Sequence, residues 1–138
     1  MSEAGKSTVT PTLNSDEEDI LHVSTYDQAG IPVVLAEGDV DLCTTPTLRQ
    51  ALEDVCSRRT EPGTVAVDIR QVPFIDSAGL ALLVEIRKRY YEKCRLALII
   101  ERGSQPERVL RLGRFDTFLQ VRYAPEDLSA ADTVGAPN

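Results

Sequence analysis

Tryptophan is absent from the chain, and aromatic residues make up only 5% of its 138 residues. The hydrophobic share is nevertheless 42%, so a core must be built from aliphatic side chains. A chain of this length can form one domain with a single core. No segment approaches the roughly 18 apolar residues of a membrane-spanning helix, and the N-terminus lacks the basic and apolar stretches of a secretion signal. We therefore expect a cytoplasmic domain that does not enter a membrane.

Residues that bind metals or form disulfides are few. The only histidine is His22, and the cysteines Cys43, Cys56 and Cys94 are an odd set without C-x-x-C spacing. This set indicates neither a zinc site nor a disulfide framework. We expect the cysteines to be free and to serve as small buried hydrophobic residues. A disulfide formed under oxidative stress is the alternative. We expect no metal and no cofactor.

Basic residues are outnumbered by acidic residues, 15 to 22, which gives a formal net charge of −7. Much of the excess lies in residues 1–19, where Glu3 and the acidic run at 16–19 are accompanied by Lys6 alone. Affinity for nucleic acid depends on clustered lysine and arginine. The charge balance therefore argues against nucleic acid as a direct partner.

One domain is expected at residues 19–132, between a flexible acidic arm at 1–18 and a tail at 133–138. Within the domain, apolar segments typical of strands alternate with segments of helical periodicity. Strands are expected at residues 20–26, 32–36, 65–69, 96–100 and 119–123. Helices are expected at residues 45–56 and 80–93, between Ser104 and Gly113, and from Pro125 onward. This order predicts an α/β fold with a mixed sheet of four to five strands and about four helices.

Two of these helices have clear start signals. Thr45 is expected to be the N-cap of the first helix, with Pro46 at the first helical position. Ser104 and Glu107 form the pattern of a capping box, in which the glutamate reaches back to the N-cap amide. Gly113 is placed to end that helix.

The most informative motif is Asp76-Ser77-Ala78-Gly79-Leu80, a polar turn between an apolar strand and a long amphipathic helix. The first backbone N–H groups of a helix lack partners within it, so a serine oxygen or an attached anion is favoured there. Three roles for Ser77 follow from this position: a simple N-cap, a catalytic nucleophile, or a switch that is modified by phosphate. The N-cap is the most frequent role of an isolated serine before a helix.

Enzymatic roles lack residues that they need. A hydrolase elbow has glycine where this chain has Ile75, and the only candidate base, His22, lies in an expected strand. No glycine-rich nucleotide-binding loop occurs. Asp41 and Asp76 stand at strand-to-helix junctions where Mg²⁺ could bind, although acids there more often interact with the helix dipole. A receiver domain with Asp68 as phosphoacceptor also needs an acidic pair after its first strand and a lysine after its last, and both are missing.

Two segments together resemble the STAS domain of bacterial anti-sigma factor antagonists. Gly38-Asp39-Val40-Asp41 precedes the first helix and matches that family's G-E-[LI]-D turn, with Asp39 in place of the usual glutamate. Asp76-Ser77-Ala78-Gly79-Leu80 matches the D-S-[SAT]-G-[LI] turn that opens the second helix. The resemblance extends over about residues 20–128. It implies a protein-binding regulator, not an enzyme.

The resemblance also implies that Ser77 is phosphorylated by a partner that is both an anti-sigma factor and an ATP-dependent serine kinase. The unphosphorylated domain would bind this partner and free a sigma factor, and a PP2C-type phosphatase would reset the phosphorylated form. By the same matching, the surface that contacts the partner comprises Asp41, Thr44, Thr45, Asp76, Ser77, Ala78 and Gly79. A second hypothesis is a STAS module that serves as an accessory or ligand-sensing part of a transporter or a signalling complex.

Overall fold

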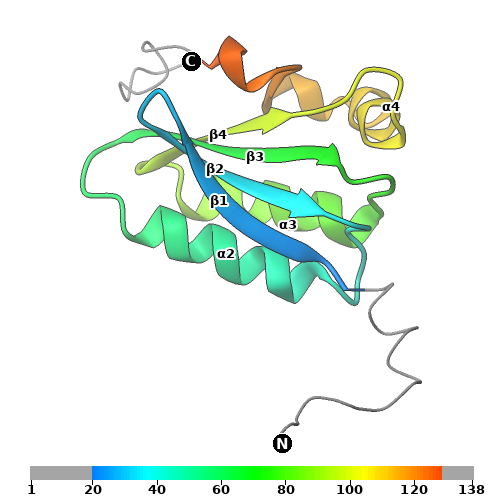
Figure 1. The fold of residues 1–138 in the computed structure, drawn as a ribbon, viewed down its shortest axis with the longest axis horizontal. Coiled ribbons are helices and arrows are strands. Elements are labelled where there is room, and N and C mark those ends of the chain that lie inside the picture. Colours follow the sequence, from blue (N-terminus) through cyan, green and yellow to red (C-terminus); the bar gives the residue numbers. More distant parts are fainter. Residues whose placement is uncertain (1–19, 129–138) are drawn as a thin grey trace, which may run out of the picture.

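Residues 20–128 are described by the structure, a computed structural model. The arm expected at residues 1–18 and the tail expected at 133–138 lie outside the described residues. The described residues form an α/β unit around a mixed five-stranded sheet, which confirms the predicted fold class (Figure 1). No helix in this part of the chain is long and apolar enough to cross a membrane.

The sheet has the strand order β1-β2-β3-β4-β5. Its strands are β1 (His22–Gln28), β2 (Ile31–Glu37), β3 (Gly63–Gln71), β4 (Cys94–Ile99) and β5 (Gln120–Arg122). β1 and β2 form an antiparallel hairpin, and every other neighbouring pair is parallel. Most of β3 and β4 is buried, as expected of parallel strands covered on both faces, which read as continuous apolar runs.

Three helices occur among the described residues, one fewer than the sequence predicts: α2 (Thr45–Ser57), α3 (Ser77–Arg89) and α4 (Gln105–Leu112). Two short 3₁₀ turns follow, η1 (Phe115–Thr117) and η2 (Pro125–Asp127). The prediction of a helix from Pro125 onward is therefore wrong within the described residues, where only η2 forms. The acids of η2 suit a helix start, but the chain is already extended at Leu128, where φ is −77° and ψ is 127°.

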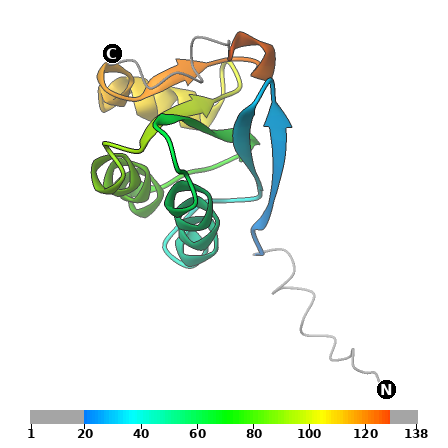
Figure 2. The same ribbon diagram turned by 90° about the vertical axis from the view of Figure 1, so that its left-hand side faces the viewer.

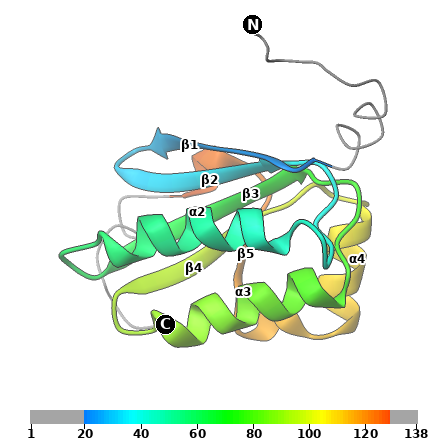
Figure 3. The ribbon, with the colours of Figure 1, turned by 90° about the horizontal axis from the view of Figure 1, so that it is seen from below.

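Helices α2 and α3 lie side by side on one face of the sheet (Figure 3). Residues at helical spacing face the sheet from both helices: Leu48, Leu52 and Cys56 of α2, and Gly79, Leu82, Leu83 and Ile86 of α3. The opposite face of the sheet carries a smaller apolar cluster that includes Leu128, and η2 lies on that side (Figures 1 and 2). Both helices run from the same edge of the sheet, so their first residues meet there.

Helix α3 ends at Arg89, four residues before the end that its apolar pattern suggests. Tyr90 departs from helical angles, with φ of −110° and ψ of 26°. The amides of Lys93 and Cys94 then both donate to the Tyr90 carbonyl in a turn that leads into β4. The apolar periodicity continues into this turn, which is why the sequence places the end of the helix too late.

Candidate functional site

Two loops meet at the edge of the sheet where α2 and α3 begin. The loop after β2 and the loop after β3 are joined by backbone hydrogen bonds, from the Val40 amide to the Phe74 carbonyl at 2.9 Å and from the Asp76 amide to the Val40 carbonyl at 3.1 Å. Val40 and Ile75 form an isolated parallel bridge that extends the pairing of β2 with β3. The two motifs singled out in the sequence, 38–41 and 76–80, are therefore neighbours in space.

Asp76 is the N-cap of α3. One carboxylate oxygen accepts a hydrogen bond from the Gly79 amide at 3.0 Å, and the other accepts one from the Leu42 amide at 3.3 Å. The same side chain thus caps α3 and ties it to the loop after β2. Of the three roles considered for Ser77, that of N-cap is therefore wrong, because the aspartate one residue earlier caps the helix.

Ser77 is the first residue of α3, and its side chain is exposed. Its hydroxyl makes no hydrogen bond to any residue in the part of the chain that the structure describes. The first amides of a helix have no partner within it, and Asp76 satisfies only that of Gly79. An exposed hydroxyl therefore stands at the positive end of a helix.

The loop that precedes α2 is held by its own side chains. The Asp41 carboxylate accepts hydrogen bonds from the amides of Cys43 and Thr44 at 2.9 and 3.1 Å. The Thr44 hydroxyl is buried, donates to the Asp39 carbonyl and accepts from the Asp41 amide, both at 2.9 Å. Helix α2 begins at Thr45, so its N-cap is Thr44 and not Thr45, and Thr44 makes no side-chain cap bond because its hydroxyl is already used in the loop.

Gly79 allows α3 to begin against the two loops. A Cβ atom at this position would lie 2.6 Å from a side-chain carbon of Ile75 and 2.8 Å from one of Val40. Both neighbours belong to the bridge between the loops. The glycine of the motif is thus explained by close packing, not by an unusual backbone angle.

Gln105, near the start of α4, also supports the site and was missed by the sequence analysis. Its side-chain oxygen accepts from the Ile75 amide and its side-chain amide donates to the Ile75 carbonyl, both at 2.9 Å. This pair of bonds imitates a neighbouring strand and fixes the loop directly before Asp76. The capping box at Ser104 gave the start of α4, but no local pattern indicates a contact 30 residues away.

An apolar groove runs along α3 from Ser77. It is shallow and open to solvent, has a volume of about 650 Å³, and is lined by Ser77, Leu80, Ala81, Val84, Glu85, Lys88, Arg89 and Phe115. Leu42 and Phe74, on the two loops of the site, add exposed apolar surface, with exposed fractions of 73% and 43%. Exposed apolar surface of this kind is typical of protein interaction sites. The sequence analysis singled out neither residue, although Leu42 stands directly after Asp41 of the first motif.

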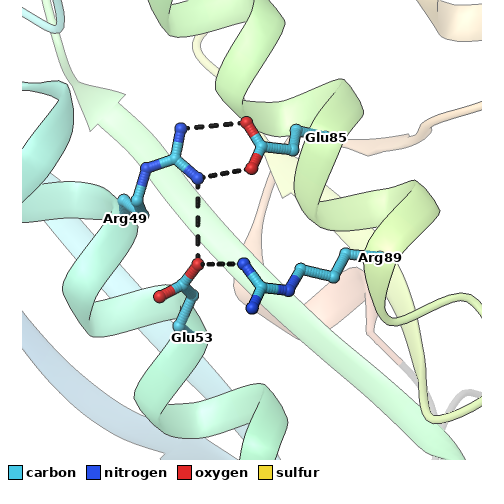
Figure 4. Close-up of polar contacts among 4 residues, drawn as sticks. All are labelled: Arg49, Glu53, Glu85 and Arg89. Atoms are coloured by element: carbon cyan, nitrogen blue, oxygen red, sulfur yellow. Dashed lines mark hydrogen bonds and ion pairs between the residues drawn. The ribbon is translucent and has the colours of Figure 1, made fainter.

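A network of ion pairs joins α2 to α3 below the site (Figure 4). Arg49 forms two hydrogen bonds with Glu85, at 2.6 and 2.9 Å, and Arg89 contacts Glu53 at 2.8 Å. The hydrogen bonds from Arg49 lower the pKa of the Glu85 carboxyl. These side chains are partly exposed to solvent, so the network fixes the position of the two helices more than it adds to stability.

The residues considered for enzymatic roles lie elsewhere or are occupied. His22 begins β1 and pairs with Glu37. Asp68 is fully buried on the other face of the sheet, where Tyr26 and Arg70 donate to its carboxylate at 2.8 to 3.0 Å. Burial raises the pKa of Asp68, but the hydrogen bonds from Arg70 and Tyr26 outweigh burial and hold that pKa below its ordinary value. This geometry makes Asp68 a structural residue.

Comparison with known proteins agrees with this arrangement. The family model of the STAS domain matches residues 22–128. The chain belongs to the STAS domain family. Over 98 residues it is 26% identical to the anti-sigma-F factor antagonist RsfB of Mycobacterium tuberculosis, an alignment that covers 71% of this chain and 78% of that protein.

Solved structures share the fold of this STAS domain. An anti-sigma factor antagonist from Mycobacterium paratuberculosis matches with a TM-score of 0.69 and 24% identity, over 79% of this chain and 91% of that one. The anti-sigma factor antagonist SpoIIAA matches in its unphosphorylated form with a TM-score of 0.54 and 18% identity, over 78% of this chain and 91% of that one. Its phosphorylated form, from Bacillus, matches with a TM-score of 0.52 and 14% identity, over 78% and 95%. The family assignment made from the two motifs is confirmed.

Proposed function

We propose that this STAS domain is an anti-sigma factor antagonist and that Ser77 is its phosphorylation site. The unphosphorylated domain binds an anti-sigma factor with serine kinase activity, and a sigma factor is released. Phosphorylation of Ser77 ends the binding, and a PP2C-type phosphatase restores it. The observation that carries this proposal is the exposed Ser77 hydroxyl, which is spared from capping because Asp76 caps α3.

A phosphate on Ser77 is compatible with the fold. It adds a charge of about −1.5 to −2 at pH 7, at the end of α3 where the helix dipole favours negative charge. Asp76 is the preceding residue and Asp41 lies on the adjoining loop, so repulsion offsets part of this gain. No hydrogen bond of the described residues has to break to make room, and the phosphorylated domain stays folded.

The same phosphate opposes a partner docked at the groove. The groove is floored by Leu80, Ala81 and Val84, and Ser77 stands at its end. A partner surface matched to this apolar floor and a neutral hydroxyl would meet unpaired charge, which must be desolvated on binding. A penalty of about 3 kcal/mol already weakens an affinity by more than a hundredfold. Release therefore needs no rearrangement of the domain.

The similar proteins support this role. RsfB is an anti-sigma-F factor antagonist, and SpoIIAA, also an anti-sigma factor antagonist, has been solved in unphosphorylated and phosphorylated forms with the same fold. Because SpoIIAA keeps its fold in both forms, its phosphorylation acts at the surface. The Ser77 hydroxyl fits such a role, since it makes no hydrogen bond to another described residue.

Phosphate mapping tests the proposal. The purified chain is incubated with ATP and each anti-sigma kinase of its source organism, and phosphate is located by mass spectrometry. We expect one site, at Ser77, and no phosphate in Ser77→Ala. Ser104 is the matched internal control, because it also stands at a helix start but its hydroxyl is hydrogen-bonded. Phosphate on Ser104 or elsewhere, or none with any of the kinases, would overturn the proposal.

A further inference from the structure

Cys56 and Cys94 lie together at the end of α2 that is remote from Ser77. Cys56 is in the last turn of α2, Cys94 is the first residue of β4, and both are buried. The Cys94 thiol donates to the Cys56 carbonyl, with 3.9 Å between the sulfur and the oxygen, so the two cysteines are direct neighbours. The sequence, with 37 residues between them and no C-x-x-C spacing, gave no sign of this pair.

Two cations stand beside the pair. Lys93 directly precedes Cys94, and its ammonium donates to the Ser57 carbonyl at 3.4 Å. Arg59 follows Cys56 by three residues, and its guanidinium donates to the Glu61 carbonyl at 3.3 Å. The hydrogen bond from Cys56 lowers the pKa of the Cys94 thiol against the opposing effect of burial, and both cations add to the lowering. Of the two residues, Cys94 is the less completely buried, with 5% exposure against 0% for Cys56.

We propose that Cys56 and Cys94 are a redox-sensitive dithiol, which a hydroperoxide oxidises to an intramolecular disulfide within the folded domain. The Cys94 thiolate attacks the O–O bond of hydrogen peroxide and becomes a sulfenic acid, while the hydroxide that leaves combines with the proton lost by Cys94. The Cys56 sulfur then attacks the Cys94 sulfur, and the hydroxyl group leaves as water with the Cys56 proton. Two thiols are oxidised and one peroxide is reduced to two waters.

The disulfide joins α2 to the sheet and closes a long loop of the unfolded chain. A cross-link of this kind stabilises a protein mainly by restricting its unfolded state. Eleven residues of helix, about 16 Å, separate Cys56 from the start of α2 at Thr45, next to the site. The oxidised domain therefore gains stability and keeps the Ser77 surface free.

Peroxide treatment of the folded wild-type chain tests the pair directly. After oxidation, remaining thiols are blocked, the chain is digested without reductant, and disulfide-linked peptides are identified by mass. We expect a Cys56–Cys94 peptide pair, about 2 Da lighter than the two thiol peptides together. We also expect the midpoint of thermal unfolding to rise by at least about 5 °C, and dithiothreitol to reverse both changes.

Three variants make the result specific. Cys43→Ser removes the exposed cysteine and should oxidise as the wild type does. Cys56→Ala and Cys94→Ala should lose both the linked peptide and the rise in unfolding temperature. The proposal is overturned if the folded wild type yields no Cys56–Cys94 peptide, if the link forms only in denaturant, or if oxidation leaves the unfolding temperature unchanged.

Discussion

Ser77 and Ser104 both stand at helix starts, yet their hydroxyls have different environments. Ser104 is the N-cap of α4: its oxygen accepts from the Glu107 amide at 3.2 Å, and its hydroxyl donates to the Glu101 carbonyl at 2.6 Å. Ser77 is the first residue of α3, and its hydroxyl has no hydrogen-bond partner within residues 20–128. The Ser104 hydroxyl therefore caps its helix, whereas the Ser77 hydroxyl is exposed and bonded to no described residue.

The difference between the two serines comes from the residue beside each. Asp76 caps α3 with one carboxylate oxygen and accepts from the Leu42 amide with the other. The Ser77 hydroxyl is therefore not needed as a cap. At α4 no acid precedes the serine, and Ser104 must cap the helix itself. A serine at a helix start is thus a candidate for modification when a neighbour takes over its capping role.

The largest expected effect is on binding, and it separates function from stability at Ser77. Ser77→Asp should weaken binding of the anti-sigma kinase by more than a hundredfold, because the carboxylate brings charge to the end of the apolar groove. Ser77→Ala should bind as the wild type does. Titration calorimetry measures the affinities, and circular dichroism should show both variants folded. Equal affinities of the two variants would mean that charge at this position does not control the complex.

Gln105 links the start of α4 to the loop before α3. Its removal should lower the free energy of unfolding more than any other substitution considered. Gln105→Ala leaves the amide and carbonyl of Ile75 without their partner, which costs about 1–3 kcal/mol for each partly buried polar group that stays unpaired. Urea unfolding gives the free energy of unfolding. The matched variant Gln105→Glu keeps the acceptor for the Ile75 amide but sets a carboxylate oxygen against the Ile75 carbonyl, so it should also be less stable than the wild type. An unchanged stability in Gln105→Ala would show that water replaces the side chain.

Removal of the Asp76 carboxylate is expected to have the next largest effect on stability. Asp76→Ala should lower the free energy of unfolding by about 1–2 kcal/mol, because α3 loses its cap and the bond to the Leu42 amide. Asp76→Asn keeps one acceptor oxygen, which can serve the Gly79 amide but not the Leu42 amide as well, and should recover only part of the loss. If Asp76→Ala is as stable as the wild type, the Ser77 hydroxyl has taken over the cap, and the contrast between the serines fails.

The smallest effect compares the serines directly. Ser104→Ala should cost about 1 kcal/mol, the usual contribution of an N-cap. Ser77→Ala should change stability by less than about 0.5 kcal/mol, since an exposed serine is replaced by a better helix former. Urea unfolding of the two variants side by side measures the difference. A cost at Ser77 equal to that at Ser104 would assign Ser77 a capping role after all.

The capping box also shows how far local patterns reach. Ser104 binds the Glu107 amide as the pattern predicts, but Glu107 accepts from the Gly103 amide at 2.7 Å, one residue before the N-cap. The burial of β3 and β4 follows from their continuous apolar runs, and the core-facing sides of α2 and α3 follow from helical periodicity. Both signals depend only on nearby residues. The predicted N-cap of α2, Thr45, is wrong by one residue, because the helix begins at Thr45 and its N-cap is Thr44. The Thr44 hydroxyl bonds the Asp39 carbonyl in the loop, a contact that no capping pattern indicates.

The site itself could be predicted in part. The two motifs located Asp41 and the start of α3, and the family resemblance placed them together. What could not be predicted are the long-range contacts: the second bond of Asp76 to Leu42, the pair of bonds from Gln105, and Phe115 on the wall of the groove. Each depends on how distant segments meet in three dimensions, which no pattern within one segment encodes.

The most direct test of the account is the affinity of one protein sample in three states. The domain is titrated with its anti-sigma kinase before phosphorylation, after phosphorylation on Ser77, and after treatment of the phosphorylated sample with a PP2C-type phosphatase. We expect the affinity to fall by more than a hundredfold on phosphorylation and to recover fully after the phosphatase. The same affinity in all three states would contradict it.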